Sequence, residues 1–460
     1  MDGATFSIAE LQSAAAGVWQ GDLSVLPERI GISTDTRSDG TGKIFFALAG
    51  ENFDAHDFLD KAAASGCCAL CIRKDFDGAV PDLPKLRVDD VLTAFQRMAG
   101  FHRLRFPELC VAGITGSVGK TSTKEMLRAI FAEYTGDENA VLYTLGNTNN
   151  HIGVPQNLFR LNSSHRFAVI EMGTSSPGEI EPLSRMALPF AAAVNTVAGC
   201  HLEKLRSLDG VAAEKSTVYC GLPEDGVAVM GCDVHGRGIL ERASGTHRRI
   251  IFGTDPEKCD VAAVYQQGSL EGSSFELIFS RSGKRYQISW QLSGAHQAQN
   301  AACAAALALG CGVPEAAIAS GLKNTSLPGM RMKRTNIGGV EFINDAYNAN
   351  PASMRALFSL LKNSVAPDKL VLVLGGMREL GESSRAEHTA LLEIAAREFP
   401  GARLFTIGRE FSGIPGNGNH FPESSAALDA ISALLRPGDT VAAKGSRGNR
   451  VELALPEDAR

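Results

Sequence analysis

The chain has no apolar segment long enough to cross a membrane. No run of about 18 apolar residues occurs among its 460 residues. The N-terminus also lacks the charged and then apolar pattern of a signal peptide. Charge is nearly balanced, since 45 Lys and Arg residues face 51 Asp and Glu residues for a net charge of -6, which argues against general affinity for nucleic acid. We therefore expect a cytoplasmic protein with no membrane span and no nucleic-acid partner.

Cysteine is sparse and forms no pattern typical of a disulfide framework or a zinc site. The chain holds 10 cysteines, and a chain of this length can build a core without disulfides. Cys68 and Cys71 form a C-x-x-C pair, but no second Cys or Cys/His pair at zinc spacing accompanies it. Repeats and low-complexity tracts are also missing. We expect reduced thiols and no zinc.

Length and patterning predict three α/β domains, because domains average about 150 residues. Short strand and helix patterns alternate in the first hundred residues. Pro107 and Pro328 then interrupt the pattern, so we predict domains at 1–106, 107–327 and 328–460. The strands expected in these domains, in chain order, are 43–48, 67–72, 167–170, 191–194, 340–343, 370–374, 404–407 and 440–443, and the helices are 57–64, 299–309 and 352–361.

Buried-type strands separated by helical segments predict that the central domain has a parallel sheet covered on both faces. Ligands of such sheets bind beyond the carboxyl ends of the strands. Glu171, Asn195 and His201 follow strands of this kind. We therefore expect them near the site, although a lone histidine is more often structural.

Residues 113–122 predict a phosphate-binding loop. They read Gly-Ile-Thr-Gly-Ser-Val-Gly-Lys-Thr-Ser and lie between an apolar run and a helix-forming segment. Glycines let backbone N–H groups turn toward a polyanion, Lys120 can reach the β- and γ-phosphates, and the Thr121 hydroxyl can bind Mg²⁺. The chain is therefore expected to use ATP. The expected nucleotide contacts here are Thr115, Gly116, Ser117, Val118, Gly119, Lys120, Thr121 and Ser122.

Polar clusters at further strand ends and helix starts are candidates for ligand contact. They occupy 144–153, 294–302, 344–351 and 444–447. Each cluster taken alone is also explained by an ordinary turn or helix cap. Glu171 differs from them, because a carboxylate after an apolar strand can hold Mg²⁺ opposite Thr121.

The ordered set of motifs resembles the Mur ligases of peptidoglycan synthesis, and the resemblance covers nearly the whole chain. The motifs are Thr-Gly-Ser-Val-Gly-Lys-Thr, Gly-Asn-Thr-Asn-Asn-His-Ile-Gly-Val-Pro, Glu-Met-Gly, His-Leu-Glu, the Lys215 segment, His-Gln-Ala-Gln-Asn-Ala and Asp-Ala-Tyr-Asn-Ala-Asn-Pro. This resemblance implies a central P-loop parallel-sheet ATPase domain, flanked by a small α/β UDP-binding domain and a C-terminal Rossmann-like domain.

The family makes amides with ATP through an acyl phosphate, releasing ADP and phosphate. Within it, the motif at 345–351 and the segments 33–37, 45–50 and 54–56 look like the member type that joins D-alanyl-D-alanine to UDP-N-acetylmuramoyl-tripeptide. A sister ligase that adds one amino acid is the nearest alternative, but its Asp-Asn-Pro-Arg motif is not found here. A folylpolyglutamate-synthase-like ligase would not require the UDP-type first domain. A non-catalytic nucleotide-switched binding protein would not need residues that hold two metal ions, such as Glu171, His201 and Lys215.

The resemblance also implies roles for individual residues. Thr121 and Glu171 would hold one Mg²⁺, and His201 would help to hold a second. Lys215 lies where the family carries a carbamylated lysine, whose anionic oxygens bind Mg²⁺. Catalytic roles thus fall to Lys120, Glu171, His201 and Lys215, adenine contact to Asn300, ATP contact from the third domain to Arg331, Asp345 and Asn348, UDP contact to Ser33, Thr34, Asp35, Thr36, Arg37 and Phe46, and muramoyl-peptide contact to Asn149 and Asn150. We expect a monomer; the third residue of the tripeptide stays open.

Overall fold

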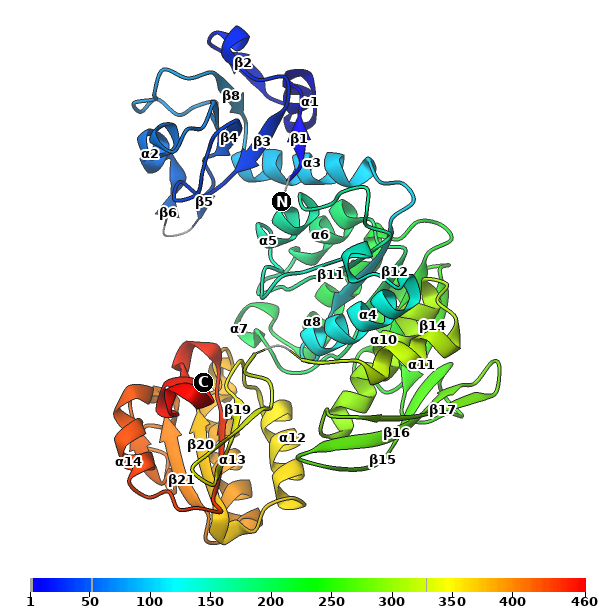
Figure 1. Ribbon diagram of the computed structural model, residues 1–460, viewed down its shortest axis with the longest axis vertical. Helices are drawn as coiled ribbons and strands as arrows, with labels where there is room; N and C mark the ends of the chain where they lie inside the picture. The colour runs from blue at the N-terminus through cyan, green and yellow to red at the C-terminus, as the bar shows by residue number, and fades with distance from the viewer. Residues whose placement is uncertain (1–2, 51–52, 328) are drawn as a thin grey trace.

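The computed structural model describes residues 3–50, 53–327 and 329–460. Three α/β domains form a row, with the N-terminal and C-terminal domains at opposite ends of the central one (Figure 1). This confirms the predicted three-domain class. The predicted boundaries fall between helix α3 and strand β9 and between helix α11 and strand β18, and they stay predictions; Pro328 itself lies outside the described residues. In the described part of the chain, no helix combines the length and apolar character needed to span a membrane.

The N-terminal domain has a six-stranded sheet with helices against it, and β5 and β6 form a separate two-stranded sheet. The strand order is β1-β3-β4-β7-β8-β2, with parallel pairs from β3 to β8 and antiparallel edges. One apolar cluster runs from this sheet across α3 into the central domain, so the two domains share packing. The elements are β1 (Thr5–Phe6), α1 (Ile8–Ala15), β2 (Val18–Gln20), β3 (Ile30–Ser33), β4 (Lys43–Phe46), β5 (Ala49–Gly50), β6 (Phe53–Asp54), α2 (Leu59–Ala64), β7 (Ala69–Arg73), β8 (Lys85–Val88) and α3 (Val91–Leu104).

The central domain is built on a nine-stranded sheet of order β10-β11-β9-β12-β13-β14-β15-β16-β17. Its pairs are parallel from β10 to β15 and antiparallel from β15 to β17. The strands are β9 (Cys110–Thr115), β10 (Val141–Tyr143), β11 (Phe167–Glu171), β12 (Ala191–Val194), β13 (Val227–Gly231), β14 (Arg248–Gly253), β15 (Val261–Ser269), β16 (Gly272–Phe279) and β17 (Lys284–Trp290). The parallel part confirms the prediction, whereas the antiparallel edge was missed. Its strands are only half buried and carry mixed polar and apolar residues.

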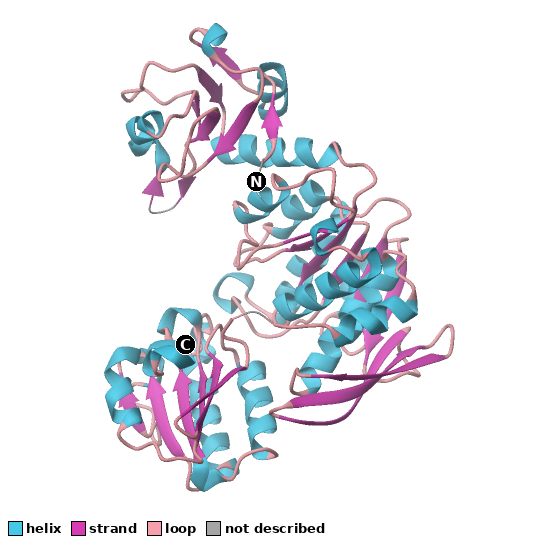
Figure 2. Ribbon diagram, viewed as in Figure 1, coloured by secondary structure: helices cyan, strands magenta, loops and turns pink. Residues whose placement is uncertain are grey.

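Helices cover both faces of the parallel part of this sheet (Figure 2). Successive strand residues point to opposite faces, and accordingly Ile114 and Val169 pack with α4, α10 and α11, while Ile170 and Val194 pack with α5 and α6. The helices are α4 (Lys120–Thr135), α5 (Gly153–Leu158), α6 (Ile180–Ala187), α7 (Leu202–Leu205), α8 (Leu208–Ser216), α9 (Arg237–Ala243), α10 (Ala295–Gly310) and α11 (Glu315–Lys323). The sheet is thereby held rigidly below the loops that follow its strands.

The C-terminal domain repeats the layered plan, with sheet order β18-β19-β23-β20-β21-β22. All pairs are parallel except β18 with β19. Separate apolar clusters cover its two faces. The elements are β18 (Lys333–Ile337), β19 (Val340–Asp345), α12 (Pro351–Lys362), β20 (Leu370–Gly375), α13 (Ser384–Glu398), β21 (Arg403–Ile407), β22 (Asn419–Phe421), α14 (Leu428–Ser432) and β23 (Thr440–Lys444).

Most predicted elements are confirmed with shifts of a few residues at their ends. The predicted helix 57–64 is a 3₁₀ turn at Ala55–Phe58 followed by α2, because the Asp54 carboxylate accepts from the His56 N–H and starts a tighter turn. The predicted strand 67–72 begins two residues later, as β7. Glu171 is the last residue of β11 rather than the residue after it.

Candidate active site

A cavity of ≈ 930 Å³ lies between the central and C-terminal domains. Loops that follow parallel strands of both sheets line it, as expected for ligand sites of such sheets. The predicted site residues that it brings together are Ser117, Val118, Gly119, Lys120, Thr121, Ser122, Asn149, Asn150, Glu171, His201, Asn300, Arg331, Asp345 and Asn348. Those outside it are Thr115, Gly116, Lys215 and the N-terminal set.

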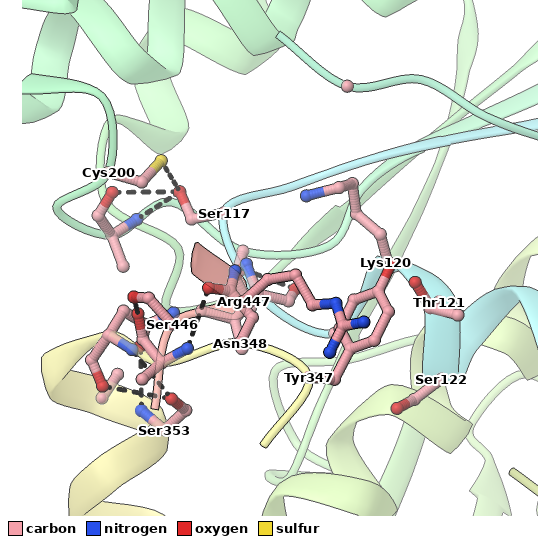
Figure 3. Close-up of a pocket in the computed structure, with 18 of the residues that line it drawn as sticks. Ser117, Lys120, Thr121, Ser122, Cys200, Tyr347, Asn348, Ser353, Ser446 and Arg447 are labelled. Atoms are coloured by element: carbon pink, nitrogen blue, oxygen red, sulfur yellow. Dashed lines mark hydrogen bonds between the residues drawn. The ribbon is translucent and has the colours of Figure 1, made fainter. Parts of the chain in front are cut away.

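The loop between β9 and α4 is held in place by the segment that follows β12. The Ser117 N–H donates to the Thr196 carbonyl (2.9 Å), and the Val118 N–H donates to the Thr196 hydroxyl (2.8 Å). The Ser117 hydroxyl donates to the Ala198 carbonyl (3.0 Å) and accepts from the Cys200 thiol (3.1 Å; Figure 3). The loop is therefore fixed before any ligand arrives.

Glycine is required at position 119 for two separate reasons. Its φ is +82°, in the left-handed region, and it precedes the first residue of α4. A Cβ atom there would also collide with the side-chain amides of Asn195 and Asn300. Thr115 and Gly116 are buried beneath this loop and are not among the residues that line the cavity; their contact with the nucleotide stays a prediction.

The N-terminal end of α4 brings together the predicted phosphate and metal residues. Lys120 Nζ donates to the Gly116 carbonyl (2.6 Å), so its charge lies at the loop. The Thr121 hydroxyl donates to Glu171 Oε2 (3.0 Å), and the Asn149 side-chain amide donates to Glu171 Oε1 (2.9 Å). Glu171 is 1% exposed. A carboxylate and a hydroxyl therefore meet at the end of β11, which is a donor set that suits a hard cation.

Asn300 braces the loop in this structure. Its side-chain oxygen accepts from the Asn195 amide (3.0 Å), and its own amide donates to Gln297 (3.1 Å). The same Asn195 amide donates to the Val118 carbonyl (3.0 Å). Contact of Asn300 with adenine stays a prediction, and it would require one of these bonds to be exchanged.

The opposite wall of the cavity belongs to the C-terminal domain. The Asp345 carboxylate accepts from Lys444 Nζ (2.6 Å), which also donates to the Asn348 carbonyl (3.0 Å). The Arg331 guanidinium lies 3.8 Å from the centre of the Tyr347 ring, a cation–π contact. These contacts fix the three residues predicted to reach ATP from this domain on the side that faces Lys120.

Lys215 lies behind the cavity wall near the end of α8. It is 1% exposed, and among the described residues its side-chain amine has no hydrogen-bond or ion-pair partner. Burial, with a smaller contribution from the nearby Lys120 charge, lowers the pKa of the Lys215 amine to about 8. About a tenth of the Lys215 amine is therefore neutral at pH 7, far more than for a surface lysine.

No group of three or more His, Cys, Asp or Glu side chains arranged to hold a metal occurs in residues 3–50, 53–327 and 329–460. A metal in this cavity would therefore depend on the Thr121 hydroxyl, Glu171 and His201, together with oxygens supplied by a phosphate chain or a modified lysine. Mg²⁺ commonly binds in this way, with few protein carboxylates and several waters or phosphates.

A second cavity, of ≈ 490 Å³, lies between the N-terminal and central domains. Thr34 lines it, and its hydroxyl accepts from the Gln156 amide of the central domain (3.2 Å). Arg29 and Lys43 also line it and bring positive charge. The remaining members of the predicted UDP set, Ser33, Asp35, Thr36, Arg37 and Phe46, are not among its lining residues.

The structure corrects the prediction for Phe46. Its side chain is fully buried in the core, with its ring centre 5.6 Å from that of Phe95, so it cannot face UDP. Apolar patterning could not distinguish a core phenylalanine from a base-stacking one. Asp35 and Arg37 are exposed and form an ion pair (2.7 Å), in which the guanidinium lowers the pKa of the Asp35 carboxyl to about 2.

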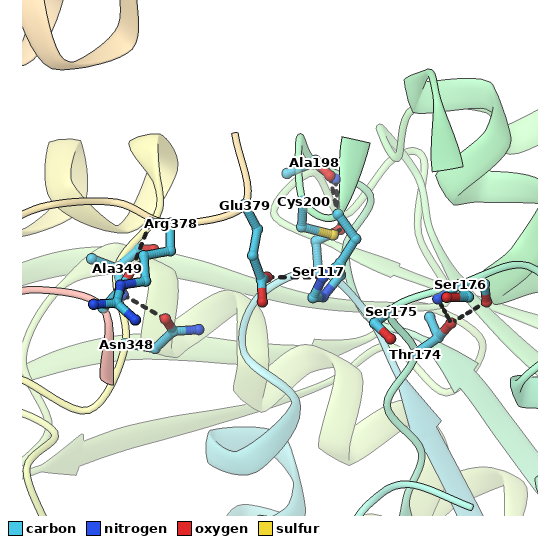
Figure 4. A network of polar contacts seen from close by, with 12 residues as sticks. Ser117, Thr174, Ser175, Ser176, Ala198, Cys200, Asn348, Ala349, Arg378 and Glu379 are labelled. Atoms are coloured by element: carbon cyan, nitrogen blue, oxygen red, sulfur yellow. Dashed lines mark hydrogen bonds and ion pairs between the residues drawn. The ribbon is translucent and has the colours of Figure 1, made fainter. Parts of the chain in front are cut away.

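Several cavity residues were not assigned from the sequence. Glu379 forms an ion pair with His201 across the domain junction (2.8 Å), and Figure 4 shows its side chain on the side that faces Ser117 and Cys200. Lys444 belongs to the polar cluster at 444–447. Its pairing with Asp345 could not be inferred without the register of β19 and β23. The sequence feature that could have identified Glu379 is an acidic residue in the loop after a predicted strand.

Comparison with protein families identifies two matching models. The model described as Mur ligase middle domain matches residues 114–308, and the model described as Mur ligase, glutamate ligase domain matches residues 330–447. The first includes the loop from Ile114 onward, Glu171 and His201. The second includes the opposite cavity wall.

Named relatives and solved structures extend the match to nearly the whole chain. The UDP-N-acetylmuramoyl-tripeptide–D-alanyl-D-alanine ligase of Escherichia coli K12 is 36% identical over 427 residues, which is 92% of each chain. The enzyme of the same name from Bacillus subtilis is 33% identical and covers 92% of this chain and 91% of its own. MurF from Acinetobacter baumannii superposes with a TM-score of 0.88 at 30% identity, over 99% of this chain and 98% of its own. MurF ligase from Thermotoga maritima, in complex with ADP, has the same fold, with a TM-score of 0.78 at 23% identity over 95% and 97% of the two chains.

Proposed function

Because this chain belongs to the Mur ligase family, we propose that its cavity joins D-alanyl-D-alanine to UDP-N-acetylmuramoyl-tripeptide with ATP. The observation that carries the proposal is that one cavity holds the phosphate-type loop, the Thr121–Glu171 pair and the polar wall of the C-terminal domain. The chain is an ADP-forming ligase in this assignment. Its product is the UDP-muramoyl-pentapeptide precursor of peptidoglycan.

The reaction consists of two displacements. A carboxylate oxygen of the tripeptide attacks the γ-phosphorus of ATP, the bond to the β-phosphate oxygen breaks, and ADP leaves from an acyl phosphate. The neutral amine of D-alanyl-D-alanine then attacks the acyl carbon, loses a proton, and expels inorganic phosphate as the amide forms. Lys120, at the loop and at the positive N-terminal end of α4, stabilises charge that develops on the β- and γ-phosphates.

The cavity offers donors for two Mg²⁺ ions in this proposal. Thr121 and Glu171 would supply oxygens for one, and His201, together with a carbamylated Lys215 behind the cavity wall, would supply ligands for the second. When bound, such ions neutralise phosphate charge and orient the reacting oxygens. The protein's own part is to hold Glu171 in place through Asn149 and Thr121, so that its carboxylate needs little reorganisation.

Lys215 is suited to carry the carbamate. Its neutral amine can attack CO₂: the N–C bond forms as one C–O π bond opens, one proton leaves, and the neutral amine becomes a carbamate anion beside Lys120. The Lys215→Ala variant tests this assignment with two readouts. We expect the variant to lose most turnover while nucleotide binding persists, and ¹³C-bicarbonate to give a carbamate signal in the wild type alone. Full activity of the variant together with no carbamate signal would refute the assignment.

The C-terminal domain completes the ATP site in this proposal. Arg331, Asp345 and Asn348 contact the nucleotide, and closure excludes water from the acyl phosphate. Asn300 contacts adenine at the other side of the cavity. Since one chain supplies both walls, we propose a monomer as the active form, with domains at 1–106, 107–327 and 328–460.

The N-terminal domain holds the UDP group in this proposal. The cavity lined by Thr34, Arg29 and Lys43 offers charge for the diphosphate and a hydroxyl beside the central domain. The muramoyl-peptide then extends toward Asn149 and Asn150, which line the larger cavity. The reaction uses ATP and a nucleotide-linked substrate, and we therefore place it in the cytoplasm.

A turnover assay with defined substrates tests the function. With ATP, Mg²⁺ and UDP-muramoyl-tripeptide, ADP release should require D-alanyl-D-alanine, and mass spectrometry should show the pentapeptide product. UDP-muramoyl-dipeptide with a single amino acid tests the sister ligase and should give no product. ADP release that ignores both substrates would favour the nucleotide-switched binding protein instead.

A further inference from the structure

A contact between His201 and Glu379 joins the two walls of the large cavity. His201 comes from the loop before α7 in the central domain, and Glu379 comes from the loop after β20 in the C-terminal domain. His201 Nδ1 and Glu379 Oε2 are 2.8 Å apart. Both residues line the cavity, so the contact lies at the proposed reaction site.

The chemistry of the pair determines which ring nitrogen carries hydrogen. An ionised carboxylate can only accept hydrogen bonds. A glutamate carboxyl is ionised at neutral pH, and Glu379 Oε2 lies within hydrogen-bond distance of His201 Nδ1. His201 Nδ1 is therefore the donor. In the neutral ring, Nε2 then keeps its lone pair.

Histidines that bind metals commonly donate their other ring N–H to a carboxylate, which fixes the tautomer and the ring orientation. The His201–Glu379 pair has this arrangement within one cavity. Its distinguishing feature is that the carboxylate and the histidine belong to different domains. The carboxylate is present at the ring only when the C-terminal domain is docked.

The backbone at both residues supports a built contact. His201 has φ +52° and Glu379 has φ +65°, which places two non-glycine residues in the left-handed region. Such conformations persist when surrounding contacts hold them. Gly381, two residues after Glu379, approaches the Glu203 side chain so closely that an added Cβ would lie 3.2 Å from Glu203 Cγ. The loop is therefore seated on the segment that carries His201.

We propose that Glu379 is a positioning residue that holds His201 as its Nδ1–H tautomer, so that docking of the C-terminal domain prepares Nε2 of the central domain for a divalent cation. The inference rests on the proposed function, because His201 is a metal ligand only there. It makes assembly of the second metal site depend on the position of the C-terminal domain. Glu379 acts through His201 and touches no reacting atom.

The tautomer can be measured directly in the wild-type chain. Histidine-selective ¹⁵N labelling and long-range ¹H–¹⁵N spectra at pH 8 distinguish protonated from unprotonated ring nitrogens, and the signal missing from His201→Ala identifies residue 201. We expect a protonated Nδ1 and an unprotonated Nε2. The Glu379→Ala variant should lose this preference. A wild-type ring with hydrogen on Nε2 would overturn the proposal without the need for any Glu379 variant.

Metal binding supplies the second readout. Mn²⁺ titration followed by EPR, with a non-hydrolysable ATP analogue, counts the sites and their affinities. Glu379→Ala should weaken the second site about 10- to 100-fold, and Glu379→Gln should lose less because its amide oxygen still accepts from Nδ1. Glu382→Ala is the matched control: it removes an exposed carboxylate from the same loop and should stay within about twofold of the wild type.

A double-mutant cycle separates this inference from the proposed function. In a His201→Ala background, Glu379→Ala should cause no further loss of Mn²⁺ affinity. If His201→Ala weakens the second site while Glu379→Ala leaves it unchanged, the positioning role is wrong and the ligand role stands. If neither variant changes Mn²⁺ binding, both the positioning role and the proposed metal role of His201 are wrong.

Discussion

The two walls of the large cavity are built in different ways. On the central wall, Glu171 is 1% exposed and Asn300 is 6% exposed, and each has protein partners. On the C-terminal wall, the Arg378 and Arg447 side chains are 48% and 55% exposed. A wall whose polar groups are already paired needs little reorganisation when charge develops. On the C-terminal wall, Lys444 is also paired with Asp345, but the two exposed arginines can adjust as the domain moves, which suits a site that must open for three substrates.

Removing the positive charge of Lys120 from the central wall should cause the largest loss of activity. Lys120→Ala takes away the ammonium that lies at the loop, where its Nζ donates to the Gly116 carbonyl, and that we assign to the β- and γ-phosphates in the transition state. We expect kcat to fall about 10³-fold or more, measured as ADP release under saturating substrates. Lys204→Ala, an exposed lysine on α7, is the control and should leave kcat nearly unchanged. Equal losses in the two variants would contradict the role assigned to Lys120.

Stability should reveal the buried lysine behind the central wall. The folded-state pKa of Lys215, about 8, lies below its ordinary value of 10.5, so the unfolded chain binds more protons between these pH values and stability rises with pH there. In CO₂-free buffer, Lys215→Met should therefore be more stable than the wild type by about 3 kcal/mol at pH 7 and by about 1 kcal/mol at pH 10. Urea denaturation at both pH values measures this difference. A pH-independent difference would contradict the buried-charge account.

A substitution on the C-terminal wall should reduce activity less, and its effect should depend on closure of the domain. Asn348→Ala removes an exposed amide from the C-terminal domain, and we expect about a tenfold loss in kcat/KM for ATP, on the scale of one polar contact. Small-angle scattering should show compaction of the wild type when nucleotide and UDP-substrate are both present. An unchanged radius of gyration, together with wild-type kinetics of Asn348→Ala, would indicate that this wall does not close on the nucleotide.

The same contrast explains what could be predicted from the sequence. The central wall is local: Lys120 and Thr121 follow a glycine loop, and Glu171 ends an apolar strand, so their chemistry is visible in short segments. The Glu379–His201 contact depends on the docking of two domains, which no local pattern encodes. The sequence gives no sign that Lys215 is buried either, because a lysine near a helix end is usually solvated.

The predictions that the structure corrects, and the strands that were missed, also have specific causes. Phe46 was predicted to face UDP, but an apolar strand residue is more often part of the core, as it is here. The antiparallel strands β15 to β17 were missed because their mixed polar and apolar residues do not resemble buried parallel strands. The parallel strands were found because each is a short, continuous apolar run.

Transfer of ¹⁸O to phosphate distinguishes an acyl phosphate from an adenylate, because the charges of Lys120 and of a cation bound at Thr121 are assigned to the γ-phosphoryl group. The tripeptide is labelled with ¹⁸O in its terminal carboxylate and incubated with ATP, Mg²⁺ and D-alanyl-D-alanine. Through an acyl phosphate, one labelled oxygen should appear in inorganic phosphate, with ADP and UDP-muramoyl-pentapeptide formed in equal amounts. The label in AMP, with pyrophosphate as the second product, would contradict the account.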